Sequence, residues 1–405
     1  MGSVRNVRAG GAVLLTAAVF AGSGAGTGWA DTAEGAAGSP PALPEVSAVR
    51  SGDGCLPPSE TVIDQRVWTE DALGLPEARG FADGDGVTVA VVGGGVDDTA
   101  AALDGAVQGA GEDCTGFGTF LAGVVAARGQ DGSGMTGVAP AARILAVPVA
   151  GDDGAAEAED VAEGIERAVD GGAGVVLVGA AVPADGEDGA VAAAVRAAAE
   201  ADALVVAPAS APVDGGTGKD AAPALPGSGS GVLAVAATGP DGAPAAREPA
   251  ADAEGRPAPV DLAAPGQAVM SVGPGGDGHF VAGGDPVAAA FVAGTAALVR
   301  SREPGLTAGE TAERLVATAY PAPGESAGAL LGAGTLDPVA ALTAAPAPVS
   351  PESGGGGVEA AAFSPDPPSG PAVGRTLAVV GGSALLILIL GLGGAALRYR
   401  RARQD

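Results

Sequence analysis

Residues 284–294 carry the stretch GDPVAAAFVAG, in which an aspartate and a proline stand directly before a run of small apolar residues. Asp285 suits the N-cap of a helix, where a short polar side chain accepts hydrogen bonds from first-turn amides. Pro286 suits the first helical position, because the amide hydrogen it lacks would have no helical partner there. The stretch therefore predicts a helix over residues 286–301.

Outside this helix, short apolar runs alternate with helical segments. Runs typical of buried strands lie at 87–92, 143–149, 175–179, 203–207 and 232–237. Further helices are expected at 120–127, 155–170, 189–201 and 307–319. This alternation predicts an α/β fold in which a central parallel sheet is flanked by helices.

The two ends of the chain predict export and anchoring. Residues 1–30 are typical of a signal peptide, with Arg5 and Arg8 before a short apolar run and a small residue at position 30. Residues 376–397 hold no charge and would form a helix of about 33 Å, enough to cross a hydrocarbon core of about 30 Å. The arginines in 398–405 predict a cytoplasmic tail. We therefore expect a single-pass protein of the cell membrane whose large domain is extracytoplasmic.

The remaining sequence divides into three parts. Residues 31–59 form an N-terminal extension, of which 31–52 are expected to be loosely ordered because they are rich in Ala, Gly, Pro and Ser. Residues 60–342 form one domain, and 343–375 form a Pro/Gly-rich tether. The contact with lipid is thus predicted to run through the C-terminal helix alone.

Charge and residue counts exclude several classes of site. The formal net charge of −28 disfavours nucleic acid, whose phosphates would be repelled. Cys55 and Cys114 are expected to form one disulfide in an exported domain, the alternative being two free or intermolecular thiols. With the cysteines paired and one histidine, no zinc cluster and no cofactor are expected. The acidic residues around Asp152 could attract Ca²⁺ but lack EF-hand spacing, which favours a solvated helix start.

Several segments occur in the order found in the subtilisin-like serine peptidases (family S8), which this chain resembles over residues 60–342. They are 87–97 (VTVAVVGGGVD), 114–123 (CTGFGTFLAG), 134–144 (GMTGVAPAARI), 260–266 (VDLAAPG), 284–294 and 332–338 (GAGTLDP). Together with the signal, the cysteine pair, the tether and the anchor, they make the chain most similar to the mycosins. That resemblance implies a three-layer subtilisin-like fold and, as partners, membrane components of type VII secretion.

The resemblance also implies that the catalytic groups have been replaced. Serine hydrolysis needs a hydroxyl, an imidazole and a carboxylate. The family's aspartate, histidine and serine positions are taken by Gly93, Phe117 and Pro286. The oxyanion asparagine would fall at Ser210 or Ala211, and the chain's one asparagine is Asn6.

Other polar residues do not fill these positions. His279 lies seven residues before Pro286 and is expected to be a loop histidine. Asp97, Asp98 and Asp104 follow the first strand without occupying the motif position. The replacements are compatible with neutral decay and with selection for a binding surface.

Three functions follow from these observations. The first is a catalytically inactive mycosin-like protein with a structural or binding role at a type VII secretion complex. The second is an active serine endopeptidase, as family membership alone would suggest. The third is an envelope protein that binds an extended peptide and is unconnected to secretion.

Overall fold

The structure is a computed structural model that describes residues 42–50, 54–184, 189–212, 221–246, 248–322 and 325–345. The chain divides into two compact units at residue 345, and the described residues all belong to the first. The predicted signal peptide, membrane span and basic tail lie outside the described residues, as does the tether beyond residue 345. Within the described part, no helix is both long enough and apolar enough to span a bilayer.

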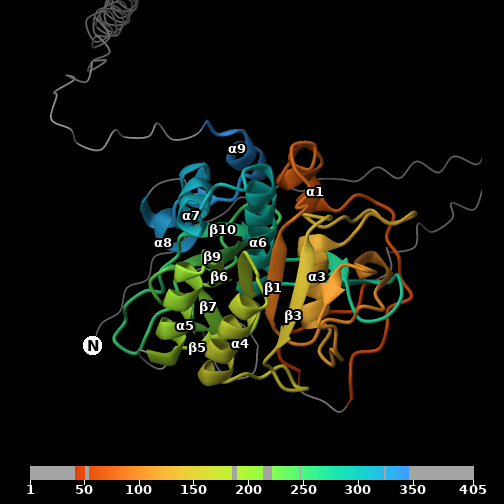
Figure 1. The fold of residues 1–405 in the computed structure, drawn as a ribbon, viewed down its shortest axis with the longest axis horizontal. Helices are drawn as coiled ribbons and strands as arrows, with labels where there is room; N and C mark the ends of the chain where they lie inside the picture. The colour runs from red at the N-terminus through yellow and green to blue at the C-terminus, as the bar shows by residue number, and fades with distance from the viewer. Residues whose placement is uncertain are drawn as a thin grey trace, which may run out of the picture. The chain divides into compact units, whose positions relative to one another are not determined.

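A nine-stranded sheet forms the centre of the domain (Figure 1). Its strand order is β13-β14-β10-β9-β6-β4-β1-β3-β2, and every neighbouring pair is parallel except β13 with β14. The strands span Thr88–Gly93 (β1), Val107–Gln108 (β2), Arg143–Pro148 (β3), Val175–Val178 (β4), Leu204–Pro208 (β6), Val232–Thr238 (β9), Leu262–Pro265 (β10), Tyr320–Pro321 (β13) and Gly334–Thr335 (β14). The predicted parallel sheet is confirmed, and all five predicted strands belong to it.

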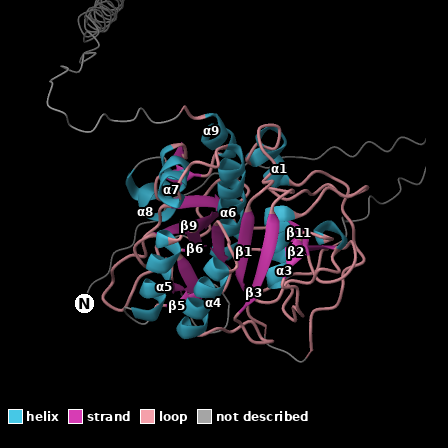
Figure 2. Cartoon of the chain, viewed as in Figure 1, coloured by secondary structure: helices cyan, strands magenta, loops and turns pink. Residues whose placement is uncertain are grey.

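Helices cover both faces of this sheet (Figure 2). Successive residues of a strand point to opposite faces, and in β1 Val89 and Val91 join one apolar core while Ala90 and Val92 join the other. The first core includes α3 (Phe117–Ala126), α6 (Asp285–Arg302), α7 (Ala308–Ala317) and α9 (Pro338–Thr343). The second includes α4 (Ala158–Asp170) and α5 (Gly189–Glu200). The architecture therefore has the three layers expected from the sequence.

Two helices begin earlier than the sequence suggested. Helix α3 starts at Phe117 instead of residue 120, because the Asp113 carboxylate accepts hydrogen bonds from the amides of Gly116 and Thr119 and so satisfies donors of its first turn. Helix α6 starts at Asp285, with Gly284 in the N-cap position. The prediction that Asp285 caps this helix was therefore wrong.

Two smaller sheets flank the main one. The first pairs β11 (Val269–Val272) with β12 (His279–Ala282), and the second has the order β5-β8-β7, formed by Val182–Pro183, Ala221–Leu225 and Ser210–Pro212. Short helices complete the described domain at Trp68–Ala72 (α1), Leu75–Ala78 (α2), Ala101–Leu103 (η1) and Glu325–Leu331 (α8).

An N-terminal strap, residues 42–50 and 54–63, crosses the surface of the domain. Val46 is buried and donates its amide to the carbonyl of Val281 in β12, at 2.9 Å. Arg50 donates its amide to the carbonyl of Asp153, and Thr61 accepts from the amide of His279, both at 2.8 Å. The expectation of loose order was thus wrong for residues 42–50, because main-chain hydrogen bonds and a buried valine fix them.

Candidate functional site

The positions matched to the catalytic triad lie at one edge of the main sheet. Gly93 is the last residue of β1, and Phe117 opens α3 against the turn that follows β1. Pro286 is the second residue of α6, directly after an aspartate that is hydrogen-bonded to β9 and to Ser210, which begins β7 two residues after the end of β6. These contacts all lie at the carboxyl ends of parallel strands, where α/β folds commonly place their sites.

Gly93, which the resemblance matches to the family's aspartate, has main-chain atoms as its nearest neighbours among the described residues. The main chain of Gly179 and Ala180 passes beside this glycine, and a Cβ built on it would lie 3.4 Å from the amide nitrogen of Ala180. That is an ordinary contact, so the backbone would accept a side chain here. The nearest carboxylate to the next residue, Gly94, belongs to Asp113, and this group already accepts four hydrogen bonds at the start of α3. Burial raises the pKa of Asp113, while those hydrogen bonds oppose the shift.

Phe117, which the resemblance matches to the family's histidine, presents an apolar ring. The side chain is 5 % exposed, and its ring lies nearly parallel to that of Phe120 with 6.5 Å between centroids. Together with Gly94 and Thr115 it lines a hollow of about 170 Å³ whose other walls are small residues of the 154–156 and 179–183 segments. Ala48 and Val49 of the strap also reach this hollow. Phe117 is thus one wall of a mostly apolar pocket.

Asp285 is the polar centre of the site. Its Oδ2 accepts hydrogen bonds from the amide and the hydroxyl of Ser210, at 3.0 and 2.5 Å, and its Oδ1 accepts one from the amide of Ala237 at 2.8 Å. Burial raises the pKa of this carboxyl, and the hydrogen bonds from Ser210 and Ala237 oppose that rise. The carboxylate thus joins the start of α6 to the strands beside it.

The hydrogen bonds between Asp285 and Ser210 also bear on the electrostatics that acyl transfer would require. A developing oxyanion is stabilised by hydrogen-bond donors, commonly the amide of the nucleophile residue together with a side chain. Pro286 has no amide hydrogen, and both donors of Ser210 point at Asp285. Ala211, the other candidate for the oxyanion position, is fully buried and has no polar side-chain group. Both hydrogen-bond donors of Ser210 are therefore engaged by the Asp285 carboxylate.

Sequence reasoning did not foresee the role of Asp285. The signal it could have used is a single charge directly before the run of small, mostly apolar residues at 286–299, since a charge next to a buried helical segment needs partners from other elements. Those partners come from residues 48 and 75 positions earlier in the chain.

His279 takes no part in this constellation. It is 1 % exposed and begins β12, so the expectation of a loop histidine was wrong. Its Nδ1 accepts the amide of Ile63 at 2.9 Å, which places the ring hydrogen on Nε2, 3.0 Å from the hydroxyl of Ser133. Burial lowers its pKa. The ring joins β12 to the strap and to the loop at Ser133.

Three other acidic residues near the predicted sites have local partners. Asp97 accepts the amide of Thr99 through Oδ1, and Asp153 accepts the amide of Ala155. At the start of α4 the carboxylate of Asp160 accepts the amide of Glu157 in a capping arrangement. These contacts stabilise turns and a helix start.

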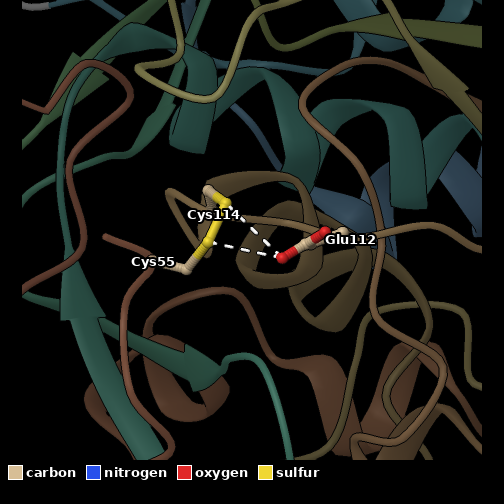
Figure 3. Close-up of side chains that lie close together, drawn as sticks. All are labelled: Cys55, Glu112 and Cys114. Atoms are coloured by element: carbon tan, nitrogen blue, oxygen red, sulfur yellow. Dashed lines mark hydrogen bonds between the residues drawn. A yellow bond between two sulfur atoms is a disulfide. The ribbon is translucent and has the colours of Figure 1, made fainter. Parts of the chain in front are cut away.

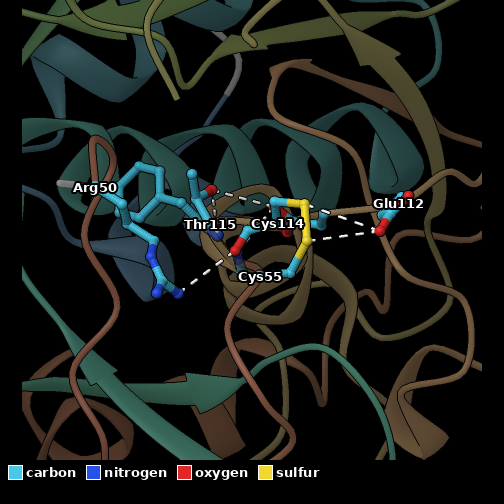
Figure 4. The surroundings of a disulfide bond; sticks show 8 residues. Arg50, Cys55, Glu112, Cys114 and Thr115 are labelled. Atoms are coloured by element: carbon cyan, nitrogen blue, oxygen red, sulfur yellow. Dashed lines mark hydrogen bonds between the residues drawn. A yellow bond between two sulfur atoms is a disulfide. The ribbon is translucent and has the colours of Figure 1, made fainter. Parts of the chain in front are cut away.

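Cys55 and Cys114 are joined by a disulfide, which fastens the strap just before α3 (Figures 3 and 4). The carbonyl of Cys114 also accepts the amide of Leu56 at 2.8 Å and the guanidinium of Arg50 at 3.5 Å. Glu112 points its carboxylate at the bridge, with Oε1 3.5 Å from the sulfur of Cys55 and 3.9 Å from that of Cys114.

Comparison with known proteins identifies related chains. The profile of the Subtilase family matches residues 84–338. Mycosin-3 of Mycobacterium tuberculosis is 35 % identical over 83 % of this chain and 84 % of its own length. The solved structure of MycP1, described as a serine protease and an essential component of the type VII (ESX-1) secretion system, has a TM-score of 0.60 at 29 % identity and covers 75 % of this chain and 96 % of its own. A chain of an intact ESX-5 inner membrane complex has a TM-score of 0.61 at 26 % identity, over 88 % of this chain and 97 % of that one.

Proposed function

The chain belongs to the subtilase family, and we propose that it is a catalytically inactive, mycosin-like member that acts by binding. The observation that carries this proposal is the Asp285–Pro286 pair at the head of α6. Proline supplies neither the hydroxyl that attacks nor the amide that would stabilise the oxyanion. The aspartate engages both donors of Ser210, which leaves a negative charge in the centre of the site.

The loss of single groups would not be enough for this conclusion. Peptidases without triad residues keep a residual rate that comes from the oxyanion hole and from substrate binding. In this chain the oxyanion donors are affected together with the triad positions Gly93, Phe117 and Pro286. The alternative, an active endopeptidase, is favoured by family membership, but it would require a nucleophile and a base from residues outside the motif.

The partner we propose is the membrane complex of a type VII secretion system. Support comes from MycP1, described as an essential component of such a system, and from the similar chain within the ESX-5 inner membrane complex. Anchoring through residues 376–397, with the described domain on the extracytoplasmic side, belongs to this proposal. Because the fold is retained without the catalytic groups, the contribution to such a complex would be structural.

A second candidate function is the binding of an extended peptide. The hollow beside Phe117 favours it, since its mostly small, apolar walls could take one apolar side chain of a strand-like ligand. Val49 of the strap already lies at this hollow, so a peptide would have to pass beside the strap or displace it.

Two experiments test the proposal. The full chain, purified from membranes in mild detergent, is treated with a serine-directed fluorophosphonate beside MycP1 as the positive control. We expect labelling of MycP1 alone, and stoichiometric labelling of one serine in this chain would refute inactivity. Affinity purification from crosslinked cells should then recover membrane components of type VII secretion. Recovery of soluble peptides without those components would favour the second candidate.

A further inference from the structure

The two bonded cysteines and one glutamate form a cluster of three residues of types that bind metal ions in proteins. Cys55, Glu112 and Cys114 each place one ligand atom within 4.8 Å of the others, and Cys55 and Glu112 are exposed to solvent (Figure 3). With the cysteines bonded to each other the sulfurs carry no charge, so the disulfide form offers a metal only Glu112. The expectation that no zinc site exists applies to this form alone.

We propose that the dithiol form of this protein binds one Zn²⁺ through Cys55, Cys114 and Glu112. The dithiol is the form in which the chain is synthesised, before oxidation. It is also reached when a dithiol reductant transfers two electrons and two protons to the bridge and itself becomes a disulfide. Each cysteine thiol then releases one proton as its sulfur binds the metal, and Glu112 supplies an oxygen.

The position of Glu112 fits this geometry. With Zn–S bonds of about 2.3 Å and a Zn–O bond of about 2.0 Å, tetrahedral angles put the oxygen about 3.5 Å from each sulfur. With the sulfurs still bonded to each other, Oε1 of Glu112 lies 3.5 Å from the sulfur of Cys55 and 3.9 Å from that of Cys114, so the carboxylate starts close to both. The two sulfurs would have to part to about 3.8 Å, which rotation of the two side chains can provide. A fourth position would stay open to water.

The main chain would hold the site in place without the bridge. The amide of Leu56, next to Cys55, donates to the carbonyl of Cys114 at 2.8 Å. On the other side of Cys55, Arg50 donates its guanidinium to the same carbonyl and its amide to the carbonyl of Asp153. Figure 4 shows Arg50 and Glu112 reaching the cysteine pair from opposite sides. Reduction would therefore leave the two thiols facing each other.

The test uses the full chain, reduced and kept free of oxygen, with Co²⁺ as a spectroscopic probe. We expect one equivalent of Co²⁺ to produce a thiolate-to-cobalt charge-transfer band that Zn²⁺ then removes. The oxidised chain should show no such band. Absence of the band in the reduced chain would overturn the proposal.

Variants distinguish a metal site that the fold creates from two thiols that bind metal independently of the fold. Glu112→Gln should weaken Zn²⁺ binding by about 10-fold or more, at least the loss that follows removal of an outer-sphere partner. Asp98→Asn changes another acidic residue of the open surface hollow that Cys55 and Glu112 line, and it should leave the affinity unchanged. An unaltered affinity in Glu112→Gln would refute the role of the carboxylate. Equal affinity of the folded chain and of the reduced chain in urea would show that the fold builds no site, and would overturn the proposal as well.

Discussion

Replacing Asp285 by alanine should destabilise the domain by about 2–4 kcal/mol. The carboxylate accepts three hydrogen bonds, from the amide and hydroxyl of Ser210 and from the amide of Ala237. The hydroxyl of the partly buried Ser210 can turn to another acceptor, but the two amides are fixed in the backbone. Each buried amide without a partner costs about 1–3 kcal/mol, which gives about 2–6 kcal/mol for two.

Loss of the charge itself works in the opposite direction. Burial raises the pKa of Asp285, which means that the ionised carboxylate pays a desolvation penalty that alanine would not. Relief of this penalty brings the expected loss of unfolding free energy to about 2–4 kcal/mol, the lower part of the range of about 2–6 kcal/mol. Asp285→Asn, which keeps one acceptor oxygen, should lose less than alanine.

The measurement is urea unfolding of the full chain at neutral pH, followed by far-ultraviolet circular dichroism. Glu163→Ala serves as the control, because this glutamate is exposed on α4 and should stay within about 0.5 kcal/mol of the unchanged protein. If Asp285→Ala also stays within that range, the carboxylate does not stabilise the junction of α6 with β7 and β9, and its hydrogen bonds to Ser210 and Ala237 contribute no stability.

Three further predictions concern the site, the histidine and the bridge. The triple variant Gly93→Asp, Phe117→His, Pro286→Ser should show at most weak peptidase activity and fluorophosphonate labelling, because loss of an oxyanion donor alone costs about 2.7–4 kcal/mol. Activity near that of MycP1 would contradict this prediction. Because burial lowers the pKa of His279, its neutral ring contributes stability that is complete above pH 6.5 and is lost as the pH falls toward the folded-state pKa. The unfolding free energies of the unchanged protein and of His279→Gln, measured between pH 4 and 8, should therefore diverge on the acid side. Parallel pH dependences would exclude this role of the histidine. Closing the loop between Cys55 and Cys114, 59 positions apart, should stabilise the domain by about 4 kcal/mol, so a double serine variant that unfolds at the same urea concentration would argue against the bridge.

Local sequence patterns were sufficient for the central part of the fold. The strand prediction at 87–92 differs from β1 by one residue at each end, and the helix prediction at 189–201 differs from α5 by one residue at its end. Both are continuous segments with a clear local signal: the strand is a short apolar run, and the helix places its apolar residues with the helical period.

Features that depend on distant contacts could not be predicted in the same way. Residues 42–50 of the strap have the composition of a loose segment, and contacts with the distant residues Val281 and Asp153 fix them. Asp285 has the sequence context of a helix cap, yet its partners lie on strands that are distant in the chain. Likewise, the burial of His279 depends on Ile63 and Ser133, which are 216 and 146 positions away. In each case tertiary hydrogen bonds decided what local propensity left open.

The docking of the strap sets an order for assembly. Ile63 leaves the ribosome 216 residues ahead of His279, the residue to which its amide is bound. At about 5–20 residues per second, this interval lasts about 10–40 s. During that time the N-terminal segment cannot take up its final place on β12, and the Cys55 thiol has no fold to hold it beside Cys114. The strap must therefore close after β12 has been made, so its docking reports that synthesis has passed the first twelve strands that the structure describes.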